Sequence, residues 1–510
     1  MTRPGIGAVT ATVMATVAAV TACTCSQLRS RTIAQPVIDA RTLVLTQRVA
    51  QTDTEAAEPM IVEHPNGTLF VAGMGGPWTT NSEYYSHRRH LDSLVHDRLW
   101  KSRDHGTSWI PVDLGPSAAG VVGQSDVDLA VAPDGTLYYA SMTWNETDGE
   151  GRRVAIGVSH DLGATWTWKV LSERRFDDRP WVVVAPDGTA HVIWNDGRGV
   201  QHVSSRDGGA TWSEPTRVHD SGGSSHLAVG PQGELAVRLI PWSASHNFFN
   251  PGVDLIAVST DGGTTWNTVP APGRRDWRTP VPDAASSYAG PADTVRVENR
   301  PRPRHSCCSD TIVPRWIEPL AWDGEGLLYS LWTDTTGVWL ARSADRGASW
   351  KTWRIVESHL HILRGHQPVF SDWGSVTSRI HHGVYFPYLV ARGDGELAAT
   401  WHVGDGDSLH WQAARIQVGH DTSPPRVTVS RLLDLDAFDW GDSTHAAGLL
   451  HVTAGEYLGV TFLHDGGIGV ITPLQQTRSG PVGFTFWRFD PPERSQSAPP
   501  SLHSNRHSHE

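Results

Sequence analysis

Short apolar stretches alternate with a recurring kind of turn along most of the chain. Each of these turns carries Asp or Asn, or Gln once, before a Gly, and apolar residues lie on both sides. Asp-Gly and Asn-Gly between alternating apolar runs are the strongest short-range signal for a β-hairpin. The pattern therefore predicts seven hairpins, with turns at residues 64–67, 133–135, 186–188, 231–233, 323–326, 393–395 and 465–467.

A second turn is an octapeptide, Ser-x-Asp-x-Gly-x-Thr/Ser-Trp. It occurs five times and places its carboxylates at Asp104, Asp161, Asp207, Asp261 and Asp345. The carboxylate can accept backbone N–H bonds inside a tight turn, and the glycine can adopt the positive φ that such a turn needs. The tryptophan supplies a large apolar side chain to cover the neighbouring sheet. We interpret these five aspartates as structural.

The two turn series interleave along the first five units. Each unit then has the order strand, first turn, strand, longer loop, strand, octapeptide, strand, which is one four-stranded propeller blade. Two further units carry the first turn without the octapeptide, and residues 42–47 can supply the last strand of the final blade. The sequence predicts an all-β fold, a β-propeller of four-stranded antiparallel blades, with seven blades favoured and six as the alternative.

The octapeptide resembles the Asp box, or BNR repeat, of the sialidase superfamily. This resemblance covers most of the chain and implies a propeller, although sialidases have six blades. In that family three arginines hold the substrate carboxylate, an aspartate is the acid/base, and a tyrosine activated by a glutamate is the nucleophile. The first arginine lies in an Arg-Ile-Pro-type motif, whereas the corresponding stretch here, residues 58–62, has the sequence Glu-Pro-Met-Ile-Val without an arginine.

Blade topology predicts where function lies. If both turn types lie at one end of every blade, the long loops emerge at the other end, and long loops on a rigid scaffold commonly carry binding and catalysis. Acidic residues precede several first strands at that end: Glu58, Asp126 with Asp128, Asp177 with Asp178, Glu318 and Glu456. Carboxylates arranged in a ring around the central pore can hold calcium, bind sugar hydroxyls, or supply a general acid and base. Alternatively, each acid accepts backbone N–H bonds where its strand begins.

The resemblance assigns candidate roles at this end of the propeller. It makes Tyr457 beside Glu456 the candidate nucleophile pair and Asp126 the candidate acid/base. Four further residues are expected to bind substrate: Arg179, Arg198, Asp178 and Asp196. The alternative for a tyrosine at a strand edge is ordinary aromatic burial, and arginine is abundant throughout this chain.

The first residues predict export and a lipid anchor. Arg3 precedes an uncharged run, residues 6–22, that is short for a membrane span and typical of a signal peptide. The run ends in Val-Thr-Ala before Cys23, which resembles the lipobox of bacterial lipoproteins. We expect a signal peptide at 1–22, lipidation at Cys23, a linker at 23–41, the propeller at 42–490 and a disordered tail at 491–510. An ordinary cleaved signal is the alternative.

Composition narrows the partners. The net charge is -12, and lysine occurs only at Lys101, Lys169 and Lys351. Nucleic acid is therefore not an expected partner, because no basic stripe is available to hold phosphates. Cys307 and Cys308 are the only cysteines beyond the N-terminal segment, and their pairing stays open.

Two hypotheses follow for the function. The first is a surface-anchored, monomeric, sialidase-like protein that processes or binds a glycan, with calcium as a possible cofactor. The second is a non-catalytic propeller that binds protein or peptide, for example as an envelope assembly scaffold. An open pore mouth with converging polar residues favours the first, and a plugged or flat face with an exposed apolar patch favours the second.

Overall fold

The computed structural model describes residues 37–38, 43–51, 56–74, 97–145, 150–220, 223–240, 253–274, 318–334, 336–358, 382–405, 408–420, 423–432, 458–475 and 482–490, with short strand pieces at 242–243, 248–249, 295–297, 300–302, 369–370 and 376–377. The chain divides into residues 1–34 and 35–510, and every described residue belongs to the second part. Among the described residues, no helix is long and apolar enough to cross a bilayer.

Seven antiparallel sheets follow one another along the chain, and we number them as blades 1 to 7. The first four blades comprise β3 (Ala57–Glu63), β4 (Leu69–Met74), β5 (Arg98–Ser102) and β6 (Ile110–Pro111); β7 (Val127–Val131), β8 (Leu137–Asn145), β9 (Glu150–Ser159) and β10 (Thr167–Ser172); β11 (Asp177–Val184), β12 (Ala190–Asp196), β13 (Val200–Ser205) and β14 (Thr216–His219); and β15 (Gly223–Ser224), β16 (Ala228–Val229), β17 (Leu235–Ile240), β20 (Leu255–Ser259) and β21 (Asn267–Pro270).

The last three blades comprise β24 (Leu320–Trp322), β25 (Leu328–Asp334), β26 (Gly337–Ser343) and β27 (Lys351–Glu357); β30 (His382–Arg392), β31 (Glu396–Asp405), β32 (Ser408–Gln417) and β33 (Arg426–Leu432); and β34 (Val460–Phe462), β35 (Ile468–Gln475), β36 (Val482–Asp490) and β2 (Val44–Gln51). A short parallel strand, β1 (Val37–Ile38), extends blade 6 beside β33. Three two-stranded hairpins, β18–β19, β22–β23 and β28–β29, span Trp242–Phe249, Val295–Arg302 and Val369–Thr377, and a 3-10 turn, η2, covers Pro116–Ala118.

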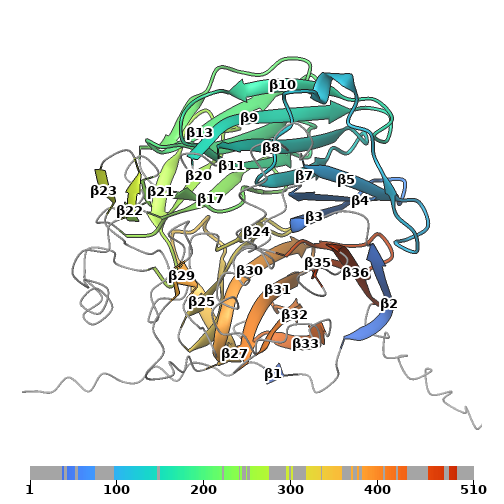
Figure 1. Ribbon diagram of the computed structural model, residues 1–510. Helices are drawn as coiled ribbons and strands as arrows, with labels where there is room; N and C mark the ends of the chain where they lie inside the picture. Colours follow the sequence, from blue (N-terminus) through green and yellow to red (C-terminus); the bar gives the residue numbers. More distant parts are fainter. Residues whose placement is uncertain are drawn as a thin grey trace, which may run out of the picture. The chain divides into compact units, whose positions relative to one another are not determined.

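The seven blades form a closed β-propeller (Figure 1). The first strands contact one another in sequence, β3 with β7, β7 with β11, β11 with β16, β16 with β24, β24 with β30, β30 with β34, and β34 with β3. The predicted closing strand is also present, because β2 pairs antiparallel with β36 and completes blade 7. The prediction of seven blades is confirmed.

The octapeptides form one repeated turn. In the first, Asp104 Oδ1 accepts bonds from Ser102 Oγ at 2.7 Å and from the Ser108 N–H at 2.9 Å. The same pair of bonds recurs at Asp161, Asp207, Asp261 and Asp345. Hydrogen bonds led by the one from Ser108 hold the pKa of Asp104 at about 2. Gly106 has φ +86, where a Cβ would also strike the ring of Phe486.

Both turn series lie on one rim of the propeller. His64 Nε2 is 3.0 Å from the carbonyl oxygen of Gly135 in the next blade, so neighbouring first turns touch. Thr136 Oγ1, in a first turn, is 3.0 Å from Nδ1 of His160, in an octapeptide. Because the strands alternate in direction, the remaining connections and the beginnings of all first strands lie at the opposite rim, which we call the mouth.

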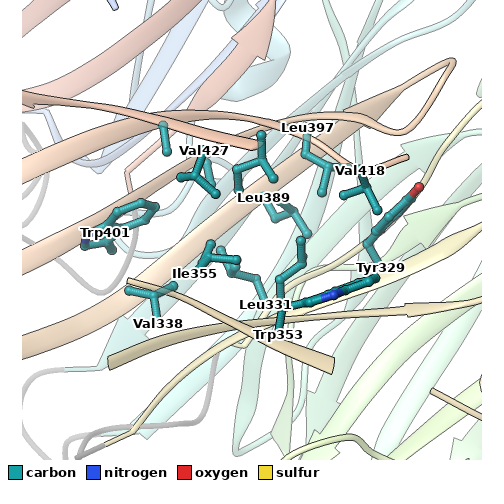
Figure 2. Close-up of a cluster of buried hydrophobic side chains, with 14 of the residues drawn as sticks. Tyr329, Leu331, Val338, Trp353, Ile355, Leu389, Leu397, Trp401, Val418 and Val427 are labelled. Carbon is teal, nitrogen blue, oxygen red and sulfur yellow. The ribbon is translucent and has the colours of Figure 1, made fainter. Parts of the chain in front are cut away.

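Apolar clusters between neighbouring sheets hold the blades together. The cluster between blades 5 and 6 brings Trp353 and Leu331 against Leu389 and Trp401, and Figure 2 shows these side chains gathered between the two sheets. Trp353 and Trp401 are both 0% exposed. Burial of aromatic side chains of this size contributes several kcal/mol to such an interface. The core of the molecule is therefore a ring of inter-blade clusters.

Candidate functional site

Three first strands carry the same β-bulge at the mouth. In β3, Glu58 and Pro59 oppose a single residue of β4, since Ala57 pairs with Met74 and Met60 with Ala72. The same two-against-one arrangement occurs in β11 and β30, at Arg179-Pro180 and Phe386-Pro387. Bulges of this kind redirect a side chain and are common next to active sites.

The bulged residues have strained backbones. Glu58, Arg179 and Phe386 have φ of 46, 54 and 48, the left-handed region that residues with a Cβ rarely adopt. Each also precedes a proline, which favours extended backbone instead. A conformation of this kind costs on the order of 1–3 kcal/mol and persists only where the surroundings enforce it. The strain therefore marks the beginnings of these strands as candidate functional positions.

Three adjacent blades carry a polar residue at the same sequence distance from the first turn. Glu58, Asp126 and Arg179 each lie six residues before the residue whose N–H opens the first turn, which is His64, Ala132 or Ala185. Glu58 is 7% exposed, and Asp126 and Arg179 are half-buried. Glu58 and Arg179 lie within their inner strands, and Asp126 lies just before β7, so two carboxylates and a guanidinium come from consecutive blades at the mouth. Carboxylates can accept hydrogen bonds from sugar hydroxyls, and a guanidinium can bind an anionic group.

Aromatic side chains close the centre of the propeller below this position. The Trp181 and His226 rings have centroids 3.8 Å apart, and the His226 and Tyr388 rings 4.8 Å apart. Met60 and Phe386 join Trp181 in the same buried cluster. Within the described residues the centre is therefore filled, and a ligand at the mouth would rest above this layer.

Asp128 is buried in the first strand of blade 2 and has a structural role. Its carboxylate accepts the N–H of Leu129 and, from the next blade, the N–H of Val182, both at 2.9 Å. Burial raises the pKa of Asp128 to about 7. Burial also raises the pKa of Tyr388, and the charge of Asp128 adds to this rise. Asp128 fits the alternative in which an acid satisfies backbone N–H groups.

Replacing Asp128 with asparagine tests whether the Asp128 carboxyl group is protonated in the folded protein. The folded protein holds the proton up to about pH 7, whereas an ordinary aspartate releases it near 3.8. Since the folded state then binds more protons than the unfolded chain, the Asp128 contribution to stability falls as the pH rises through this window. We expect the wild type to lose up to about 1.4 kcal/mol per pH unit relative to Asp128→Asn, measured by chemical denaturation across the window. A difference that does not change with pH would contradict a buried, protonated Asp128.

Two other acids predicted at the mouth are also engaged within the fold. Asp177 is 0% exposed and accepts the Arg174 N–H at 2.8 Å, and burial raises its pKa to about 6. Glu318 is 1% exposed and lies 2.7 Å from Nη2 of Arg238, which also binds Asp254 at 3.1 Å. These acids stabilise strand beginnings and the contact between blades 4 and 5.

The predicted substrate-binding residues separate into two groups. Asp196 is 8% exposed and accepts bonds from Gln201 Nε2 at 2.6 Å and from Arg217 Nη1 at 3.1 Å. Arg198 is exposed and donates its backbone N–H to Asp196 at 3.0 Å. Asp178 and Arg179 are half-buried at the start of β11. The geometry therefore keeps Arg179 at the mouth and directs Asp196 toward its partners within blade 3.

Three predicted residues and most long loops lie outside the described residues. Cys23, Glu456 and Tyr457 are among them, so their predicted roles stay predictions. In sequence, Tyr457 precedes the turn residue Leu463 by six positions, as Glu58 precedes His64.

The bulges at Glu58, Arg179 and Phe386 were not predicted from the sequence. A proline follows each bulged residue, Glu58, Arg179 and Phe386, but Glu318 before β24 also precedes a proline and has no positive φ.

No known protein family matches the sequence, and no curated protein matches it. Solved structures similar to the fold include a Dyadobacter fermentans protein of unknown function, with 14% identity, 88% of this chain and 99% of that one covered, and a TM-score of 0.43. The GH93 alpha-L-arabinofuranosidase of Fusarium graminearum is 11% identical, with 87% of this chain and 97% of that one covered, and a TM-score of 0.40. The intramolecular trans-sialidase from Ruminococcus gnavus is 12% identical, with 88% of this chain and 96% of that one covered, and a TM-score of 0.38. This chain is similar to these proteins at low identity, and its assignment as a propeller rests on its own seven sheets.

Proposed function

We propose that this protein binds a glycan at the mouth and cleaves a glycosidic bond there. The observation that carries the proposal is the placement of Glu58 and Arg179 on strained bulges at the beginnings of β3 and β11, with Asp126 just before β7 in the blade between them. A pair of carboxylates is the usual equipment for glycoside hydrolysis, because one protonates the leaving oxygen and the other activates water or attacks the sugar. In the proposal, Glu58 and Asp126 fill these two roles.

Arg179 favours a substrate that carries an acidic group. A guanidinium binds a carboxylate through two parallel charge-assisted bonds, so a sugar that carries an acidic group would be held in one orientation. The predicted pair of Glu456 and Tyr457 belongs to the same proposal as a further source of a nucleophile. Lipid attachment at Cys23 belongs to it as well, because a propeller held outside the cell would meet extracellular glycans.

A binding function without catalysis is the second candidate. The filled centre of the propeller favours it, because the aromatic layer of Trp181, His226 and Tyr388 leaves only the rim of the mouth for a partner. It also requires an exposed apolar patch at the mouth. Among the described residues, however, the large exposed apolar side chains are Val44, Leu45, Ile110 and Val170. These four lie on outermost strands, so the glycan proposal is preferred.

Hydrolysis of fluorogenic glycosides by the full chain tests the proposal. Sialosides and neutral glycosides would be compared, with and without calcium. We expect cleavage of an acidic glycoside and a loss of at least about 100-fold in kcat/KM for Glu58→Gln and Asp126→Asn, since general acid/base groups contribute this much. Arg179→Ala should weaken acidic substrates more than neutral ones.

Arg206→Ala is the matched control, because Arg206 is an exposed arginine of the same blade at the opposite rim. It should leave the rate unchanged. Glycan binding without turnover in the wild type would support the second candidate in a carbohydrate-binding form. Absence of both binding and turnover on all glycans, or full activity in Glu58→Gln and Asp126→Asn, would remove the mouth carboxylates from the function.

A further inference from the structure

A mixed cluster of metal-ligating side chains lies on the rim opposite the mouth. Glu325 comes from the first turn of blade 5, Asp394 from the first turn of blade 6, and His420 from the connection between β32 and β33. One ligand atom from each, two carboxylate oxygens and one imidazole nitrogen, lies within 4.8 Å of the other two. The three side chains are exposed, so an ion can reach them from solvent.

The spacing within the cluster suits a small transition-metal ion. Two ligands bound about 2.1 Å from a tetrahedral zinc ion stand about 3.4 Å apart. His420 Nδ1 and Glu325 Oε2 lie 3.5 Å apart, which matches this separation without movement. An imidazole with two carboxylates suits zinc, whereas calcium takes six to eight oxygen ligands. Two carboxylates also balance the charge of a divalent cation.

The backbone that carries His420 is fixed by blade 5. The Arg342 guanidinium donates to the carbonyl oxygen of Gly419 and, at 3.4 Å, to that of His420. Gly324 and Gly393 also approach closely, because a Cβ on Gly324 would lie 3.5 Å from the Cα of Gly393. The turns that supply the three ligands are therefore held together by contacts that do not depend on an ion, which limits the ordering that binding requires.

The cluster occupies the place of a missing octapeptide. Five other third-to-fourth strand connections are closed by the Asp-centred turn, but blade 6 has Val-Gly-His-Asp-Thr-Ser-Pro-Pro at residues 418–425. We propose that Glu325, Asp394 and His420 bind one divalent transition-metal ion of the zinc class, which connects blades 5 and 6 at this rim. A bound ion stabilises the folded state through its affinity for that state.

Zinc titration of the metal-stripped full chain tests this proposal by calorimetry and by thermal unfolding. We expect zinc to bind one site that His420→Ala and Glu325→Gln each weaken by at least roughly tenfold, and to raise the melting temperature of the wild type more than that of either variant. Glu325→Gln keeps the shape of an exposed side chain, so it covers the case in which His420→Ala fails to fold. Calcium at the same concentration should produce no such shift.

His464→Ala is the matched control. His464 also lies in a first turn, with Nδ1 3.8 Å from Glu63 Oε1, and is 55% exposed. It belongs to no three-ligand cluster among the described residues. Since the chain has 26 histidines, other histidines can also bind zinc, and the comparison with His464→Ala measures this background. Equal zinc affinity in His420→Ala, Glu325→Gln and His464→Ala, or no zinc binding by the wild type, would overturn the proposal. Since the cluster is remote from the mouth, either result leaves the glycan experiment independent.

Discussion

Replacing Arg238 with methionine is expected to lower the free energy of unfolding by about 3–5 kcal/mol. Arg238 is 1% exposed and lies between two carboxylates, Asp254 and Glu318, that are 0% and 1% exposed. Its guanidinium also donates to the Pro272 carbonyl oxygen at 3.1 Å. Without the guanidinium, two buried carboxylates lose their cation, and each must be protonated or hydrated at the cost of local structure.

Urea denaturation measures this loss, with the transition slope compared to detect partial unfolding. Arg354→Met is the control, because Arg354 forms its ion pair at 3.4 Å with Glu357, whose side chain is 55% exposed. A surface pair of this kind is worth about 1 kcal/mol or less. If Arg238→Met costs no more than Arg354→Met, the buried triad does not hold blades 4 and 5 together.

Truncation of Trp353 to alanine is also expected to cost about 3–5 kcal/mol. Trp353 comes from the outermost strand of blade 5 and fills the interface with blade 6, beside Leu331 and Leu389 (Figure 2). At 0% exposure its removal leaves a cavity that the two sheets can close only in part. We expect a lower unfolding midpoint with the fold retained, and circular dichroism at low denaturant would check this.

Trp339→Ala provides the comparison for Trp353→Ala. Trp339 is on the adjacent strand of the same blade, half-buried, and stacked against Trp332 with centroids 6.1 Å apart. Because the half-buried Trp339 side chain removes less apolar area from water, Trp339→Ala should lower the free energy of unfolding by roughly half as much or less. Equal costs for the two substitutions would contradict a special contribution of Trp353 to the contact between blades 5 and 6.

The mouth shows how far sequence patterns reach. Repeat counting predicts Glu58 and Asp126 at the beginnings of inner strands, and in the structure Glu58 lies in β3 and Asp126 directly before β7. The same pattern did not separate Asp128 and Asp177 from the others, although their carboxylates accept backbone N–H bonds at strand beginnings. An acid that satisfies backbone donors and an acid that faces a ligand have the same sequence signature, because the difference depends on the neighbouring blade.

The sequence by itself determined the hairpins and the octapeptide turns, and it favoured seven blades over six. These features depend on interactions within a few residues, such as the bond from the Ser108 N–H to Asp104. Only the tertiary structure decided that the centre is filled, that Glu318 is neutralised by Arg238, and that three inner strands are bulged. These features arise where residues of different blades or strands meet, and burial and charge compensation are set there by the register of the sheets.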